Sequence, residues 1–184
     1  MKIALADLVL LLVLLICVWT DLQERKIYNK VVFPAVFAGV VIHTASLGLP
    51  GMKTSIVGFI AGMLLFLVPF ALGGLGAGDV KLLGAVGALK GPLFALYTAL
   101  GTALVGGVIA VAFLLWRHEL WSTLKRLTLA CVLFMSGRWT GKKGALLLLE
   151  RTPYSSLFPY GLAISLGTIA AYCIIIFQKT VTIG

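Results

Sequence analysis

Charged side chains are scarce in this 184-residue chain: Lys, Arg, Asp and Glu together make up 11% of it, against 61% for hydrophobic residues. A soluble globular domain carries about 25% charged residues. This chain therefore lacks the polar surface needed to keep so many apolar side chains out of water. The scarcity excludes an ordinary soluble enzyme and predicts an all-α integral membrane protein. The length suits a single membrane domain over residues 1–184, with no sizeable soluble domain beside it.

Paired cysteines are absent as well. Cys17, Cys131 and Cys173 stand alone in apolar surroundings, and no CxxC pair signals a zinc site or a redox motif. An isolated cysteine of this kind packs as a small hydrophobe. We therefore expect no metal and no cofactor.

The formal net charge is +9, which in a soluble protein would suggest nucleic acid as a partner. Here the basic residues lie in loops between apolar runs, as the orientation bias of membrane proteins predicts. We therefore expect a lipid bilayer with anionic headgroups as the partner of these charges, and no nucleic acid.

Six apolar segments are candidates for membrane helices, since about 20 apolar residues cross the hydrocarbon core. The first could pass for a signal peptide, but no small-residue cleavage site precedes Asp21, so we expect a retained helix. The fourth would rise only about 15 Å, so we expect it to start inside the protein or to continue past Gly91. The segments are Ile3–Thr20, Val31–Leu49, Thr54–Leu72, Val80–Leu89, Pro92–Trp116 and Leu157–Phe177.

Basic residues orient these six spans. Eleven Lys and Arg residues fall in the loops at 21–30, 73–81 and 117–156, and four fall on the other side. This bias places the three loops in the cytoplasm and both termini outside. The segment 117–156 has apolar residues at helical spacing between its charges, so we expect an amphipathic cytoplasmic helix at the membrane interface.

Small residues mark the expected contacts between helices. Gly58 and Gly62 form a GxxxG in the third segment, and Gly84 and Ala88 repeat the spacing in the fourth. Such positions let backbones approach closely in a membrane.

Two of the six acidic residues are candidates for catalysis. Asp21 ends the first span and Asp79 opens the fourth segment, so the predicted topology puts both at the cytoplasmic face. Two nearby carboxyls share a proton and titrate as a pair, which is the apparatus for hydrolysing a peptide bond without a metal. In the alternative reading, Asp21 balances the basic residues that follow it, while Asp79 caps a helix and pairs with Lys81.

The residues around Asp79 suggest a substrate-binding role. Gly76 and Gly78 would let a substrate backbone approach Asp79. Lys81 could bind an acidic group, lower the pKa of the pair, or extend its side chain to the headgroups. A phosphate-binding loop is a poorer interpretation of these glycines, because the GK[ST] ending is missing and Asp79 would repel phosphate.

Three stretches resemble the type IV prepilin peptidases. The GxGD motif of that family, in its longer G-x-G-D-[VI]-K-L form, is matched by GAGDVKLLGA at 76–85. The segment around the family's first aspartate is matched by TDLQERKIYN at 20–29, and the P-Y-G-x-A-I run opening its last helix by FPYGLAI at 158–164. GxGD alone is a weak signal, but the extended motif with both flanking runs in the family's order is a strong one.

The resemblance implies an aspartic endopeptidase of the cytoplasmic (inner) membrane. Such enzymes remove the short basic leader from prepilin-like proteins at the cytoplasmic face, cleaving after glycine. It implies that Asp21 and Asp79 are the catalytic residues and that a prepilin-like protein is the substrate.

Two departures from the family pattern are informative. Tyr28 stands where the family usually has proline, so we expect the turn to be set otherwise, with Asn29 as the helix cap. The N-terminal domain with paired CxxC motifs found in larger, methylating members is missing. The chain thus resembles the short form found with Flp (tight-adherence) pili, or the archaeal preflagellin peptidases, and N-methyltransferase activity is not expected.

Two other functions stay open at the level of sequence. A broader GxGD intramembrane protease of the presenilin kind would carry Y-D, G-L-G-D and P-A-L, where this chain has T-D, G-A-G-D and P-Y-G. A small transporter or assembly subunit would use the carboxylates as proton or cation sites and would release no peptide product.

Overall fold

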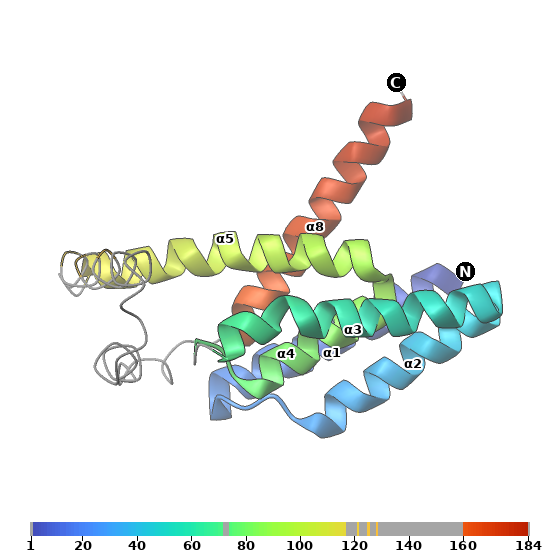
Figure 1. Cartoon of the computed structure of the whole chain (residues 1–184), viewed down its shortest axis with the longest axis horizontal. Coiled ribbons are helices and arrows are strands. Elements are labelled where there is room, and N and C mark those ends of the chain that lie inside the picture. Colours follow the sequence, from blue (N-terminus) through green and yellow to red (C-terminus); the bar gives the residue numbers. More distant parts are fainter. Residues whose placement is uncertain are drawn as a thin grey trace, which may run out of the picture. The chain divides into compact units, whose positions relative to one another are not determined.

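A computed structural model describes residues 2–71, 74–116 and 160–183, together with Trp121, Lys125 and Thr128. The described residues form helices and their connections, without a strand, which confirms the all-α class (Figure 1). The helices are α1 (Lys2–Glu24), α2 (Asn29–Leu47), α3 (Leu49–Ala71), α4 (Ala77–Lys90), α5 (Pro92–Trp116) and α8 (Tyr160–Ile183).

Five of these helices are long and apolar enough to cross a membrane: α1, α2, α3, α5 and α8. This confirms a multi-pass membrane protein. The predicted fourth segment is α4, whose 14 residues rise about 21 Å, and it is not among the five. The count of six spans and the outside position of both termini therefore stay predictions.

Contacts within the chain divide it into two units. The first comprises residues 1–106 and 158–184, and all the contacts analysed below lie within it. The second, residues 107–157, contains the end of α5. The predicted amphipathic helix over 117–156 lies outside the described residues, apart from Trp121, Lys125 and Thr128.

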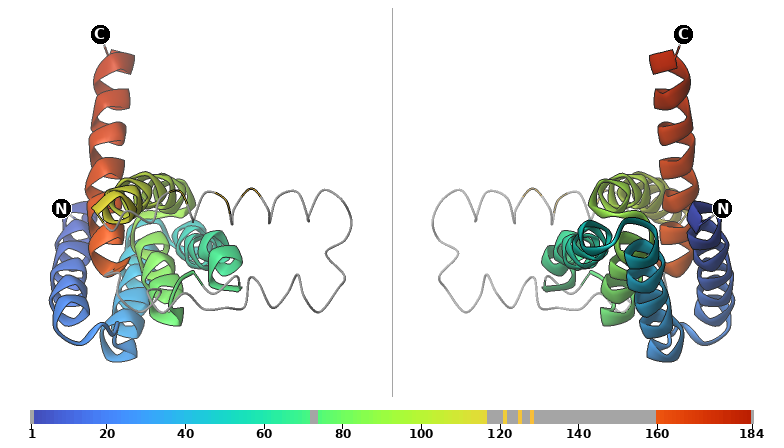
Figure 2. Two further views of the ribbon diagram at one scale, coloured as in Figure 1. Left: turned by 90° about the vertical axis from the view of Figure 1, so that its left-hand side faces the viewer. Right: turned by 90° about the vertical axis from the view of Figure 1, so that its right-hand side faces the viewer.

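Helix α4 is the buried centre of the first unit. Asp79, Val80 and every residue from Leu82 to Leu89 are buried. Helices α2 and α3 pack along it, and α1 and α8 also contact it (Figure 2). A helix that is apolar on every side needs such an enclosed place. The surrounding helices instead expose large apolar side chains such as Leu12, Phe37 and Val68, as suits a hydrocarbon solvent.

Glycines allow the backbones of α2 and α3 to touch that of α4. A Cβ atom built on Gly58 would lie 2.0 Å from the carbonyl oxygen of Gly87. One on Gly62 would lie 2.4 Å from that of Leu83, and one on Gly39 in α2 would lie 2.7 Å from that of Ala88. The close helix contacts predicted from the GxxxG spacing are thus confirmed, and the structure shows that they join α3 to α4.

Replacing Gly58 by alanine should separate α3 from α4, because the opposing atom is backbone and cannot turn aside. We expect the free energy of unfolding to fall by about 1–3 kcal/mol. Thermal unfolding of the detergent-purified protein measures this. Gly106→Ala is the matched control, since among the described residues no atom beyond the adjacent residues and the local helix backbone lies within 4 Å of the Cβ built there. Equal destabilisation by both changes would contradict the close contact.

Candidate active site

Asp21 lies in the last turn of α1 and is buried, with 6% of its surface exposed. The helix ends at Glu24. The next residue, Arg25, has a φ of +53°, and no other non-glycine residue in the described part of the chain has a positive φ. This left-handed residue turns the chain out of the helix axis. The connection at 25–28 therefore begins immediately beyond Asp21.

The start of α8 holds the carboxylate of Asp21. The backbone N–H of Gly161 donates to Asp21 Oδ2 at 2.7 Å, and the N–H of Leu162 contributes a second hydrogen bond. These N–H groups belong to the first turn of a helix, where they have no partner within the helix itself. The same end carries the positive pole of the helix dipole. Residues 140 positions apart in the sequence thus orient one carboxylate.

Asp79 lies in the first turn of α4 and is 7% exposed. Its Oδ2 accepts a hydrogen bond of 2.9 Å from the backbone N–H of Gly76, which reaches back over the start of its own helix. The glycine-rich run before α4 thus supplies a donor to the carboxylate, as well as space around it. Both aspartates accept backbone N–H groups at the start of a helix.

Asp21 and Asp79 open into one cavity of about 350 Å³. The walls come from the end of α1 and its connection to α2, and from the start of α4. The residues that line it are Asp21, Arg25, Lys26, Ile27, Tyr28, Asn29, Gly76, Gly78 and Asp79. The cavity therefore brings together two carboxyls and two basic side chains that come from separate parts of the chain.

The surroundings of Asp79 change its acidity. Asp79 precedes the apolar part of α4 and lies outside the five candidate spans. Burial, together with the negative charge of Asp21, raises the pKa of its carboxyl to about 6, and the hydrogen bond from Gly76 partly opposes this rise. A carboxyl with this pKa can hold or release a proton near neutral pH.

The other predicted site residues lie at different distances from this cavity. Gly76 and Gly78 line it, and a Cβ atom on Gly78 would lie 2.9 Å from Ile27 Cβ, so the small residue lets the wall close. Lys81 is not among the lining residues described. Its ammonium group donates to Asn29 Oδ1 at 3.1 Å and lies 5.7 Å from the centre of the Phe33 ring. Lys81 thus joins α4 to α2 beside the cavity.

The expectation that Asn29 caps α2 is wrong. Asn29 is the first residue of the helix, and the cap is Tyr28, in an extended conformation without a side-chain cap hydrogen bond. The Asn29 side chain accepts the hydrogen bond from Lys81 instead, and the Tyr28 hydroxyl donates to Glu24. Contacts to α4 and α1 therefore stabilise this turn, at the position where a proline would have restricted the backbone.

Among the described residues, no group of three His, Cys, Asp or Glu side chains could hold a metal ion. What the cavity does contain is a carboxyl pair that can exchange a proton with water. Sequence reasoning identified both aspartates but assigned no role to Gly161. The only sequence signal for it was its place in the P-Y-G run.

The comparisons with known proteins agree with this geometry. A family model described as "Type IV leader peptidase family" matches residues 8–111, which is more than half of the chain. The chain therefore belongs to the type IV leader peptidase family, and is a peptidase by that membership. No curated protein and no solved structure matched it. The match includes Asp21, Asp79 and the whole of α4 but ends before α8.

Adding one methyl group at Gly161 should misplace Asp21, because a Cβ atom there would lie 2.9 Å from Asp21 Oδ2 and 3.1 Å from its Cβ. A displacement of about 1 Å at a catalytic group can cost on the order of 100-fold in rate. We expect Gly161→Ala to lower peptidase turnover by about that factor, measured on membranes with equal amounts of enzyme. Gly106→Ala should leave turnover unchanged. Full activity of Gly161→Ala would mean that this contact does not position Asp21.

Proposed function

We propose that this protein is an aspartic endopeptidase that removes the basic leader from prepilin-like proteins, cleaving after glycine. Asp21 and Asp79 are its catalytic pair. The observation that carries the proposal is that both carboxyls line one cavity in a chain of the leader peptidase family. The extended GxGD motif around Asp79 and the run around Asp21 support it.

The chemistry follows from one proton shared between two carboxyls. The ionised carboxylate takes a proton from a water molecule, which attacks the carbonyl carbon of the scissile peptide bond. The protonated carboxyl donates its proton to the carbonyl oxygen. Breakdown of the resulting tetrahedral species transfers a proton to the leaving amine, and the C–N bond breaks. The raised pKa of Asp79 supports its holding the shared proton before substrate binds.

The reaction takes place, in this proposal, at the cytoplasmic face of the inner membrane. The bias of Lys and Arg toward the loops at 21–30, 73–81 and 117–156 supports this orientation. The end of α1 and the start of α4 then lie at that face.

Recognition of the leader rests on contacts other than charge. Arg25 and Lys26 line the cavity and would repel a basic leader placed against them. The contact with the substrate backbone is therefore proposed for Gly76 and Gly78, which leave room beside Asp79. Lys81 would act at the edge of this contact, through its hydrogen bond to Asn29.

Replacing either aspartate by asparagine should abolish cleavage, because the change is nearly isosteric and removes only the ability to titrate. The measurement is release of the leader from a co-expressed prepilin-like protein in membranes. We expect Asp21→Asn and Asp79→Asn to accumulate normally and to cut at least about 10³-fold more slowly than the wild type.

Glu24→Gln is the matched control. It removes a carboxylate three residues from Asp21 that is not among the residues lining the cavity. Normal cleavage by either aspartate variant would show that residue to be structural. A wild type that releases no peptide, together with proton or cation flux that depends on the aspartates, would favour a transporter instead.

The pH dependence should report the shared proton. Asp79 has a raised pKa of about 6, so its protonated form predominates below this pH and is lost above it. We expect kcat/KM, which reports the free enzyme, to fall about tenfold per pH unit above the pKa. Circular dichroism at each pH checks that the enzyme stays folded. A flat profile between about pH 5 and 8 would contradict a protonated Asp79 in the active form.

A further inference from the structure

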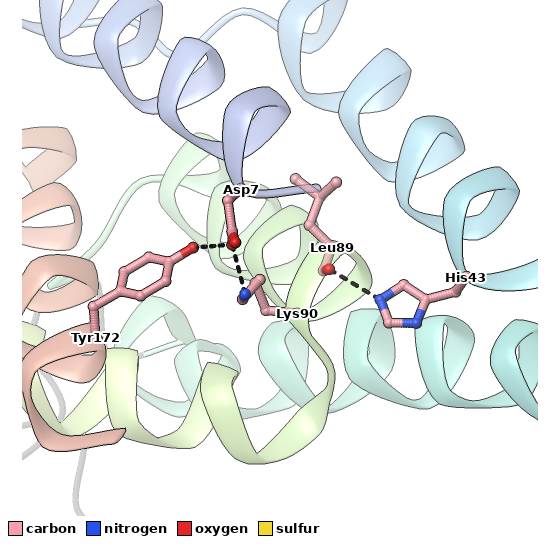
Figure 3. A network of polar contacts seen from close by, with 5 residues as sticks. All are labelled: Asp7, His43, Leu89, Lys90 and Tyr172. Atoms are coloured by element: carbon pink, nitrogen blue, oxygen red, sulfur yellow. Dashed lines mark hydrogen bonds and ion pairs between the residues drawn. The ribbon is translucent and has the colours of Figure 1, made fainter. Parts of the chain in front are cut away.

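The end of α4 that lies away from Asp79 is bound by neighbouring helices at three consecutive residues. The carbonyl oxygen of Ala88 accepts a hydrogen bond of 2.8 Å from the Ser55 hydroxyl of α3. The carbonyl oxygen of Leu89 lies 3.0 Å from His43 Nε2 of α2 (Figure 3). Since a carbonyl only accepts, this ring nitrogen carries the proton. Both carbonyls belong to the last turn of α4, where backbone carbonyls have no N–H donor within the helix.

Lys90, the third of these residues, joins α4 to α1 and α8. Its ammonium group donates to Asp7 Oδ1 at 2.5 Å, and the Tyr172 hydroxyl donates to the same oxygen (Figure 3). The ammonium also lies 5.1 Å from the centre of the Tyr172 ring and 5.5 Å from that of Phe94. These two rings meet edge to face. We call Asp7, Lys90 and Tyr172 the Lys90 cluster.

Asp7 and Lys90 of this cluster are carried by the same two helices as the aspartate pair. Helix α1 has Asp7 near its start and Asp21 near its end, about 21 Å apart along the axis. Helix α4 has Asp79 in its first turn and Lys90 as its last residue, about 16 Å apart. The two helices therefore run in opposite directions, with one polar pair at each end.

This arrangement couples the two ends mechanically. A helix is stiff along its axis, so a shift of α4 against α1 at Lys90 moves Asp79 against Asp21 by the same amount. Between Asp7 and Asp21, helix α1 carries no charged side chain that could define one register against α4. Among the described residues, an ion pair between α1 and α4 is found only at Asp7 and Lys90.

We propose that Asp7, Lys90 and Tyr172 are positioning residues for the Asp21–Asp79 pair: the cluster sets the axial register of α1 against α4. The register itself is a statement about geometry. Its effect on catalysis rests on the function proposed above.

The kinetic test compares Lys90→Met with Lys53→Met in the full chain. Lys53 is an exposed lysine in the first turns of α3. We expect Lys90→Met to lower kcat per folded molecule by about 10- to 100-fold with KM little changed, since the carboxyls and not the binding surface are displaced. Lys90→Arg, which keeps the charge on Asp7, and Lys53→Met should retain activity. A purely structural role would lower the unfolding temperature and the yield but leave kcat per folded molecule unchanged, and that result overturns the proposal.

A second measurement does not depend on peptidase activity. Cysteines replace Asp21 and Asp79 in a chain whose natural cysteines are changed to alanine, and a short bifunctional thiol reagent joins them. We expect Lys90→Met to slow this cross-linking, and Lys53→Met to leave it unchanged. Equal rates in all three chains would overturn the register, whatever the enzyme cleaves. A wild type that processes no prepilin, with cross-linking that still depends on Lys90, would refute the proposed function alone.

Tyr172→Phe covers the case in which Lys90→Met does not accumulate. This change keeps the ring beneath the ammonium and removes only the hydroxyl that donates to Asp7. We expect a smaller fall in kcat and in the cross-linking rate, both in the same direction. Wild-type values for both would count against the cluster as a positioning device.

Discussion

The enclosure of α4 by α1, α2, α3 and α8 is the constraint on which the rest of the first unit depends. A helix buried on every side can carry polar groups only at its ends, where other helices can satisfy them. Asp79 and Lys90 occupy those ends. The glycines of α2 and α3 follow from the same constraint, because side chains there would keep the backbones apart. Asp79, which lines the cavity, and Lys90, which pairs with Asp7, thus lie at the two ends of one helix.

The candidate active site combines parts of different origin. Asp79 and its donor Gly76 belong to one short stretch that folds back on the start of its own helix. Asp21 instead depends on α8, a helix that begins far along the chain and beyond the region matching the family. Each carboxyl is held by the unpaired N–H groups of a helix start, one from its own helix and one from another.

Reasoning from sequence succeeded where the relevant pattern is local. The bounds of α5 were predicted as Pro92–Trp116, and those of α3 from its GxxxG-bearing run to within a few residues. It failed at Asn29, because the competing partner of that side chain, Lys81, lies on another helix. The sequence likewise did not indicate that Asp7 pairs with Lys90, 83 positions away. No local pattern signals a bond over such a separation.

The sequence by itself determined that the helices lie in a membrane, where the apolar segments fall, and which two aspartates are worth testing. These follow from quantities that each stretch carries alone, such as the length that spans hydrocarbon and the cost of a carboxylate beside it. Only the tertiary structure decided which helix lies at the centre and that Asp21 and Asp79 share one cavity. It also decided that Lys90 and Gly161 contact Asp7 and Asp21, near the two ends of α1. Those facts depend on contacts between residues distant in the chain, and only packing brings such residues together.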